Sequence, residues 1–197
     1  GELYEGGQIL SLFNPDTYNA SLSAGPNSSD APYLMGLAPE VKYSSIITAG
    51  DDINGYKLSG LADGTGAFDN QDGTFSFLVN HEISSSLGVP RAHGSKGAFV
   101  SKWIINKNDL TIKSGSDLIR NLNLWNGTGY TTYNAANPST LASLNRLCAA
   151  DLPPVSAFYN IINGNGTQER IFMNGEEAGN EGRAFAHIAT GPNSGVS

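Results

Sequence analysis

The sequence predicts an all-β fold, and three observations indicate that class. Short runs of alternating apolar and polar residues recur along the chain. Turn-forming residues separate these runs, with 24 glycines and 9 prolines in 197 residues. Only one stretch, Ser139–Leu147, has apolar residues at helical spacing. Short strands joined by close turns are typical of sandwiches, barrels and propellers.

The first forty residues differ in composition from the rest of the chain. Residues 1–40 are dense in Asn, Pro, Ser and Gly, and we interpret them as a loop-rich N-terminal arm. The β domain is expected to occupy residues 41–197, with its first strands at Val41–Thr48 and Tyr56–Leu61. The clearest hairpin turns at Asn70–Gly73, because an Asp-Gly pair readily adopts the positive φ that a tight hairpin needs.

The remaining elements follow from the same reasoning. Thr74–Val79 alternates and is rich in aromatic and β-branched residues, so it is predicted to be a strand. A second hairpin is predicted from strands at Ala98–Ile105 and Leu110–Lys113, with a turn at Asn106–Asp109. Ser139–Leu147 is expected to be helical, with Ser139 as its N-cap. Further strands are predicted at 156–163, 169–174 and 183–190.

A weak internal repeat narrows the choice among all-β folds. Phe75–Trp103 resembles Glu169–Ile188: an apolar strand ends in Asn-x-Glu, a loop follows, and a Gly precedes a Phe-containing strand. The two asparagines, Asn80 and Asn174, are 94 positions apart, which is two units of about 40 to 50 residues, the length of a propeller blade. We therefore expect a partial β-propeller of about four blades, with a β-sandwich as the alternative.

Composition and charge exclude several classes of function. The net charge of -7 and the pI near 4.8 argue against nucleic-acid binding, because the phosphates would repel such a surface. No apolar run reaches the roughly 18 residues of a membrane-spanning helix. Low Lys content and abundant Asn, Ser, Thr and Gly suggest a secreted, extracellular or periplasmic protein. Four N-glycosylation sequons begin at Asn19, Asn27, Asn126 and Asn165.

The one cysteine and an acidic loop also bear on function, and several catalytic motifs are absent from the sequence. Cys148, the one cysteine, lies in an apolar stretch and is expected to be buried by packing. The acidic segment Asp69–Gly73 is explained by hairpin-turn chemistry and lacks the EF-hand pattern. Nucleophile-elbow, P-loop, zinc-protease and dinucleotide motifs do not occur in the sequence.

The two repeat copies place acidic and amide side chains where a strand ends and a loop begins. Carboxylate and amide oxygens are the ligands that Ca²⁺ prefers. His81 could carry a proton, and Arg91 could pair with a carboxylate or receive a phosphate. For the acidic and amide residues the plainer alternative is a solvated or turn-closing side chain, and for His81 it is a surface or packing histidine. The predicted metal ligands are Asn80, Glu82, Asn174, Glu176 and Glu177.

These motifs resemble those of the PhoX-type alkaline phosphatases and related secreted bacterial proteins. The stretch Phe77–Ser84, "FLVNHEIS", resembles the Asn-His-Glu strand end of that family, and Arg170–Gly179, "RIFMNGEEAG", is similar to its strand with a Glu-Glu pair. The resemblance covers Gly60–Ile188. It implies a secreted β-propeller that binds Ca²⁺ and hydrolyses phosphate esters. Glu82, Glu176 and Glu177 would then be metal ligands.

One position departs from the family pattern. The phosphatases have a cysteine ligand to iron before the Glu pair, and this chain has Gly175 there, so iron and full phosphatase activity are in doubt. If catalysis occurs, Arg91 and His81 are the expected catalytic residues. Two functions therefore remain: a calcium-binding, metal-dependent phosphoesterase acting on a small phosphorylated substrate, or a non-catalytic extracellular structural or binding protein. The second would have protein partners or self-assemble, for example in a surface layer or filament.

Overall fold

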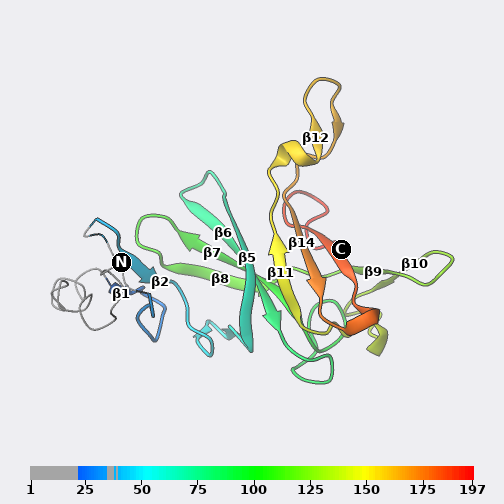
Figure 1. Ribbon diagram of the computed structural model, residues 1–197, viewed down its shortest axis with the longest axis horizontal. Coiled ribbons are helices and arrows are strands. Elements are labelled where there is room, and N and C mark those ends of the chain that lie inside the picture. Colours follow the sequence, from blue (N-terminus) through cyan, green and yellow to red (C-terminus); the bar gives the residue numbers. More distant parts are fainter. Residues whose placement is uncertain (1–21, 35–37, 39) are drawn as a thin grey trace, which may run out of the picture.

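The computed structural model describes residues 22–34, 38 and 40–197 and confirms the all-β class (Figure 1). Short 3-10 turns interrupt the strands at η2 (Thr140–Ala142), η3 (Val155–Ala157) and η4 (Gly179–Glu181). In the described part of the chain, no helix is long and apolar enough to span a membrane. The strands are β1 (Leu22–Ala24), β2 (Tyr43–Ser45), β3 (Asp52–Ile53), β4 (Tyr56–Lys57), β5 (Leu61–Asp69), β6 (Thr74–Glu82), β7 (Phe99–Asn106), β8 (Ile112–Asp117), β9 (Leu122–Trp125), β10 (Tyr130–Tyr133), β11 (Leu147–Asp151), β12 (Tyr159–Asn160), β13 (Asn165–Gly166), β14 (Ile171–Glu176) and β15 (Ala184–Ile188).

The central sheet is an antiparallel meander in the order β5-β6-β7-β8. The predicted hairpin at Asn70–Gly73 is confirmed, because it joins β5 to β6. Gln71 and Gly73 adopt positive φ angles of 61° and 87°, and the carboxylate of Asp72 accepts a hydrogen bond from the Thr74 amide at 2.9 Å. The second predicted hairpin is also confirmed, as β7 and β8.

A second antiparallel sheet, in the order β11-β14-β15, packs against the first. Strand β5 lies beside β11 (Figure 1). The approach is close at Gly64, where a methyl group would overlap the carbonyl oxygen of Cys148. Gly64 also sits in an irregularity of the β5–β6 pairing, between Ala62 and Thr65. A glycine at this position therefore lets β5 pass directly over the start of β11.

Two apolar clusters cover the two faces of the central sheet. Leu78 and Val100 belong to the cluster between the sheets, where Phe172 of β14 and Phe185 of β15 also pack. Val79 and Trp103 point to the opposite face, where Ile53 covers them. Both faces of β6 are therefore covered, and the strand predicted at Thr74–Val79 is confirmed.

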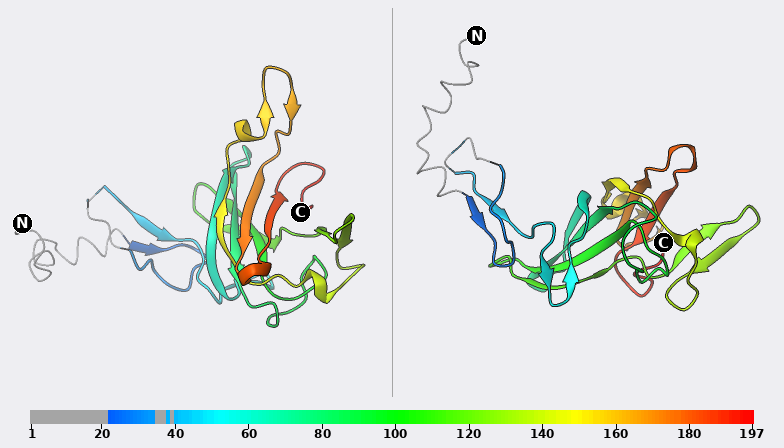
Figure 2. Two further views of the ribbon diagram at one scale, coloured as in Figure 1. Left: turned by 45° about the vertical axis from the view of Figure 1, so that its right-hand side comes forward. Right: turned by 90° about the horizontal axis from the view of Figure 1, so that it is seen from below.

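Smaller pairs of strands lie outside the two sheets. The hairpins β9–β10 and β12–β13 project away from the body of the molecule (Figure 2). Strand β1 pairs in parallel with β2, so the described part of the predicted arm contacts the chain beyond the expected boundary at residue 40. The rest of that arm, residues 1–21, 35–37 and 39, lies outside the described residues, and so does the sequon at Asn19.

The predicted helix at Ser139–Leu147 is wrong. Ser139 does cap a turn, since its hydroxyl accepts a hydrogen bond from the Leu141 amide, but that turn is the single 3-10 turn η2. Beyond it the backbone bonds to other elements: the Leu144 carbonyl accepts from the Ala98 amide at 2.9 Å, and the Arg146 amide donates to Ile83. Tertiary partners therefore replace the helical hydrogen bonds that the apolar spacing suggested.

Candidate functional site

The two strand ends of the internal repeat meet in space. The side-chain amide of Asn174 on β14 donates a hydrogen bond to the side-chain oxygen of Asn80 on β6 at 2.9 Å, and both residues are buried. The amide of Asn80 donates in turn to the Cys148 carbonyl oxygen of β11 at 2.8 Å. Strand ends that are 94 positions apart are thus held side by side, and three strands converge on one corner.

The same hydrogen-bond chain continues into β15. His187 is fully buried, its Nε2–H donates to the side-chain oxygen of Asn174 at 2.9 Å, and its Nδ1 accepts from the Ser197 hydroxyl at 2.7 Å. Burial lowers the pKa of His187 to about 3, so the ring is neutral at pH 7. Asn80 and Asn174 were predicted to be metal ligands, but their side-chain amide groups are engaged in the hydrogen bonds of this network.

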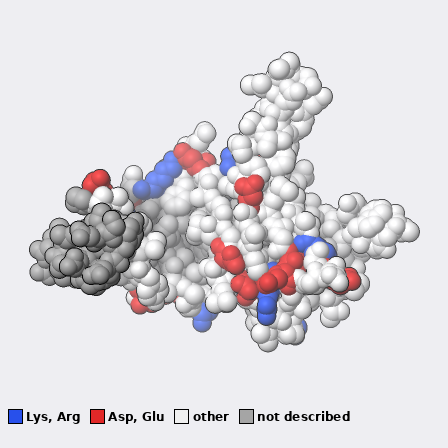
Figure 3. All heavy atoms as spheres, in the orientation of Figure 1, with Lys and Arg blue, Asp and Glu red and all other residues white. Residues whose placement is uncertain are grey.

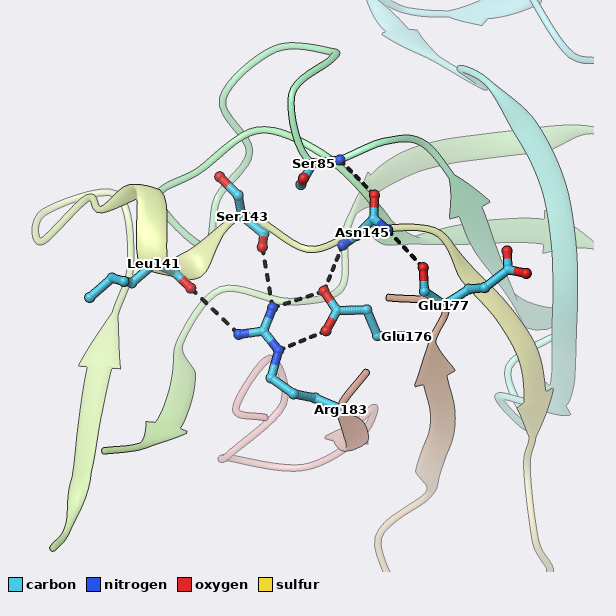
Figure 4. A network of polar contacts seen from close by, with 7 residues as sticks. All are labelled: Ser85, Leu141, Ser143, Asn145, Glu176, Glu177 and Arg183. Carbon is cyan, nitrogen blue, oxygen red and sulfur yellow. Dashed lines mark hydrogen bonds and ion pairs between the residues drawn. The ribbon is translucent and has the colours of Figure 1, made fainter. Parts of the chain in front are cut away.

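Glu176 is held by an arginine (Figure 4). Arg183 donates from Nε and Nη2 to the two carboxylate oxygens at 2.7 and 2.8 Å, and the Asn145 amide donates at 2.7 Å. Burial by itself would raise the pKa of Glu176, but the hydrogen bonds from Arg183 and Asn145 outweigh it, and the pKa is lowered. The arginine therefore already neutralises the carboxylate, and Figure 4 shows Glu177 pointing away from this pair.

A different acidic cluster forms on the other side of the corner. Donor atoms of Asp63 on β5, Glu82 on β6 and Cys148 on β11 all lie within 4.8 Å of one another. The carboxylate of Glu177 lies 3.6 Å from the Cys148 sulfur. Acidic side chains gather over this region of the surface in Figure 3. Asp63 and Glu82 form no ion pair with any residue in the described ranges.

The cysteine in this cluster differs from its prediction. Cys148 is only partly buried, and it lies beside carboxylates rather than in an apolar environment. Burial raises the pKa of the thiol to about 11, and the negative charges of Glu82, Glu177 and Asp63 act in the same direction. The thiol is therefore protonated at neutral pH and becomes a thiolate only if a cation displaces the proton.

A groove borders the cluster. Its volume is about 740 Å³, and Glu82 and Arg146 both contribute to its wall. Arg146 is half exposed and lies 3.7 Å from Glu177, so its guanidinium faces water at the edge of the acidic cluster. Its backbone has φ of 42°, which is uncommon for a residue with a side chain, and hydrogen bonds to Ile83 and Glu177 hold it there.

His81, predicted as a catalytic residue, lies on the opposite face of β6 from Asn80. Its Nδ1–H donates to the Ser59 carbonyl at 2.6 Å, its Nε2 accepts from the Ser101 hydroxyl at 2.7 Å, and its ring stacks on Phe99 at 3.9 Å. Burial lowers the pKa of His81 to about 4. The ring has no exposed surface, so the structure places it in a packed interior, and its catalytic role stays a prediction.

Arg91, the second predicted catalytic residue, belongs to the same interior. Its guanidinium lies over the Phe99 ring at 3.5 Å and 3.6 Å from the carboxylate of Asp117. That carboxylate also accepts hydrogen bonds from the Tyr56 hydroxyl at 2.6 Å and the Ala92 amide at 2.8 Å. Of the two arginine roles that the sequence allowed, the pairing with a carboxylate is the one observed.

The structure thus brings together part of the predicted set and adds residues to it. Glu82 and Glu177 both lie close to Cys148, whereas Glu176 is bound to Arg183. Asp63 could have been found from the sequence, because the predicted β5–β6 hairpin places it near the pairing partner of Glu82. Cys148 and Arg146 had no such signal, since tertiary packing brings β11 to this corner.

Comparisons of the chain with protein-family models, curated proteins and solved structures find no match. The resemblance to PhoX-type phosphatases therefore stays a prediction.

The buried histidines predict a pH-dependent stability. The pKa of His81 and His93 is lowered by burial to about 4, and that of His187 to about 3, against an ordinary value of 6.5. The unfolded chain then binds protons below pH 6.5 that the folded chain refuses, so stability falls as the pH drops from 6.5 towards 4. The expected loss is up to about 3 kcal/mol for each histidine.

Urea unfolding between pH 7 and pH 4.5 measures this dependence. His81→Gln is expected to lower the free energy of unfolding at pH 7. It is also expected to make that free energy less dependent on pH, because the variant takes up one proton fewer on unfolding. A wild-type free energy of unfolding that stays constant from pH 6.5 to pH 5 would contradict the assignment.

Proposed function

We propose that the chain is an extracellular β protein that binds a divalent cation at the corner formed by Asp63, Glu82 and Cys148. The observation that carries the proposal is the convergence of these three donor groups from β5, β6 and β11 within 4.8 Å. Neither carboxylate is offset by a cationic side chain in the described part of the chain, in contrast to Glu176. Two adjacent unpaired carboxylates repel each other, and a bound cation would remove that repulsion.

The backbone near the cluster supports the same proposal. Asp63 and Gly64 lie in the irregularity of the β5–β6 pairing. Such bulges re-aim side chains and are common next to functional sites. Asp63 belongs to this irregular segment, and its carboxylate lies beside that of Glu82 and the thiol of Cys148 on the next sheet.

The donor set bears on which cation would bind. Calcium prefers oxygen ligands, so Asp63 and Glu82, with backbone oxygens and water, would hold it without the thiol. A softer metal such as Zn²⁺ or Fe²⁺ would also recruit Cys148, because thiolate ligands suit such ions. Gly175 of β14 occupies the position at which the phosphatases have a cysteine ligand to iron. Cys148 offers a sulfur from the neighbouring strand, since Leu147 pairs with Glu176.

Phosphate-ester hydrolysis is the second candidate function, and the groove beside Glu82 favours it. A bound divalent cation would supply Lewis-acid polarisation of a phosphoryl oxygen. Arg146 is placed in the groove wall with its guanidinium exposed, where it could pair with a phosphate oxygen. In this proposal Arg146 takes the role that the sequence gave to Arg91. Without hydrolysis, the same corner fits the non-catalytic binding protein.

For the architecture, we propose a β-sandwich rather than a propeller. Neighbouring propeller blades are related by rotation about the central axis, so equivalent side chains of two blades are not expected to point at each other. Here the repeat-equivalent residues Leu78 and Phe172 belong to one apolar core, and Asn80 and Asn174 are hydrogen-bonded to each other. Mutual facing of equivalent residues supports two sheets packed face to face.

Cation binding is tested by titrating the protein with Ca²⁺, Mn²⁺ and Zn²⁺ in a calorimeter. Glu82→Gln and Asp63→Asn are each expected to weaken binding at least about tenfold. Cys148→Ser is expected to weaken Zn²⁺ binding and to leave Ca²⁺ binding nearly unchanged, because only the softer ion uses the sulfur.

Glu181→Gln is the matched control, since it removes the same charge from the exposed turn η4. If wild type binds none of the three ions, or if Glu181→Gln weakens binding as much as Glu82→Gln, the corner is not a cation site.

Hydrolysis is measured separately, as release of phosphate from a generic aryl phosphate with the preferred cation present. The expected result is activity that a chelator abolishes and that Arg146→Gln lowers about tenfold in kcat/KM. Lys96→Gln, which removes an exposed cation from another loop, is expected to keep full activity. A protein that binds the cation but releases no phosphate would refute the hydrolase and leave the binding function intact.

The sandwich predicts a specific contact in solution. Nuclear Overhauser effects are expected between the side-chain amide protons of Asn174 and the β protons of Asn80, and between Leu78 methyl groups and the Phe172 ring. Their absence in an otherwise assigned spectrum would rule out the face-to-face packing.

A further inference from the structure

We propose a second ligand site, distinct from the cation corner, that binds a small tetrahedral oxyanion between Lys102 and Arg120. The two side chains line a cavity of about 210 Å³ together with Ile104, Ser116, Leu118 and Ser194. Lys102 and Ser116 are paired across β7 and β8, so both side chains leave the sheet on the same face. Two cationic residues, two serines and two apolar residues therefore line the cavity.

Both cations are held in place by the segment after β15. The Lys102 ammonium donates to the Ala189 carbonyl at 2.9 Å, and the Arg120 Nη2 donates to the Ser194 carbonyl at 2.6 Å. Gly195 has φ of 95°, and a methyl group there would come within 2.6 Å of the Arg120 Nε. The glycine thus lets the guanidinium lie flat on the backbone, and less freedom has to be lost when a ligand binds.

These contacts leave most of the donors unused. A lysine ammonium has three N–H donors and a guanidinium has five. Lys102 and Arg120 each use one of these donors in the hydrogen bonds to Ala189 and Ser194. Neither cation forms an ion pair with a carboxylate in the described part of the chain. The pair is therefore available to an anionic ligand, although the chain as a whole carries a net charge of -7.

The repulsion between the positive charges of Lys102 and Arg120 supports a bound anion. Lys102 is half buried, and its pKa is lowered first by burial and then by the positive charge of Arg120. The two like charges therefore destabilise each other, and an anion between them would reverse that effect. Asp117 also lines the cavity, but its carboxylate is turned to the other face of β8, where Tyr56, Arg91 and Ala92 bind it.

The cavity size and donor set favour phosphate or sulfate, free or as the end group of a small ester. Such an ion has oxygens directed to several sides, which suits a cavity lined by Lys102 of β7, by Arg120 and by two serines. A long acidic peptide does not fit a cavity of 210 Å³. The shared recognition chemistry is that of a doubly charged oxyanion.

Calorimetric titration with sodium phosphate and sodium sulfate at constant ionic strength tests the proposal, with sodium chloride as the blank. Saturable binding with a Kd below about 1 mM is expected, and Lys102→Gln and Arg120→Gln should each weaken it about tenfold. A second titration uses a sugar phosphate. If the sugar phosphate binds more weakly than free phosphate, the ligand is the free ion; if it binds equally well or more tightly, the ligand is a phosphate ester.

Two controls make the result specific. Lys57→Gln removes an exposed cation from β4 and should leave the affinity unchanged. All titrations are run with a chelator present, so that any cation-dependent binding of phosphate at the corner of Asp63, Glu82 and Cys148 does not contribute. Because Lys102→Gln could loosen the fold, the Lys102 side-chain pKa is also followed by NMR in wild type, and it should rise when phosphate is added.

The proposal is overturned if neither oxyanion binds below about 1 mM. It is equally overturned if Lys57→Gln weakens binding as much as Arg120→Gln, or if the Lys102 pKa does not respond to phosphate.

Discussion

The arrangement of the molecule depends on the buried hydrogen bond between Asn80 and Asn174. A buried amide that loses its partner costs about 1 to 3 kcal/mol, so the two sheets can slide past each other only at that expense. Because Asn80 also binds the Cys148 carbonyl and Asn174 binds His187, one polar chain fixes β6, β11, β14 and β15 in a single register. The apolar cluster around it supplies most of the burial, but apolar contacts alone are not directional.

The same register explains why equivalent carboxylates differ in character. Glu82 and Glu176 occupy the same position in the two repeat copies, two residues after the paired asparagines. Beyond Asn174 the chain turns back through η4 and brings Arg183 onto Glu176, which is thereby neutralised. Beyond Asn80 the chain runs into a loop, and Glu82 instead meets Asp63 and Cys148. The difference in charge pairing, rather than the motif itself, separates a structural carboxylate from one that is available to a ligand.

Much of the fold was predictable from the sequence, because it is encoded locally. The Asp72-Gly73 turn and the alternation in Thr74–Val79 specify the first hairpin without help from distant residues. Ser139–Leu147 was predicted wrongly since its backbone bonds to Ala98 and Ile83, which no local pattern reveals. For the site, the sequence identified Glu82 and Glu177 but could not pair Glu176 with Arg183 or bring Cys148 to the corner. Those outcomes depend on how the second sheet packs on the first.

The thiol at the corner has a consequence for the chemistry of the isolated chain. Burial and the neighbouring carboxylates raise the pKa of Cys148 to about 11, so the thiol is almost entirely protonated at pH 7. Since the thiolate is the form that attacks disulfides and is readily oxidised, burial and the surrounding carboxylates together lower the reactivity of this sulfur. A cysteine with so small a thiolate fraction is therefore expected to form mixed disulfides slowly.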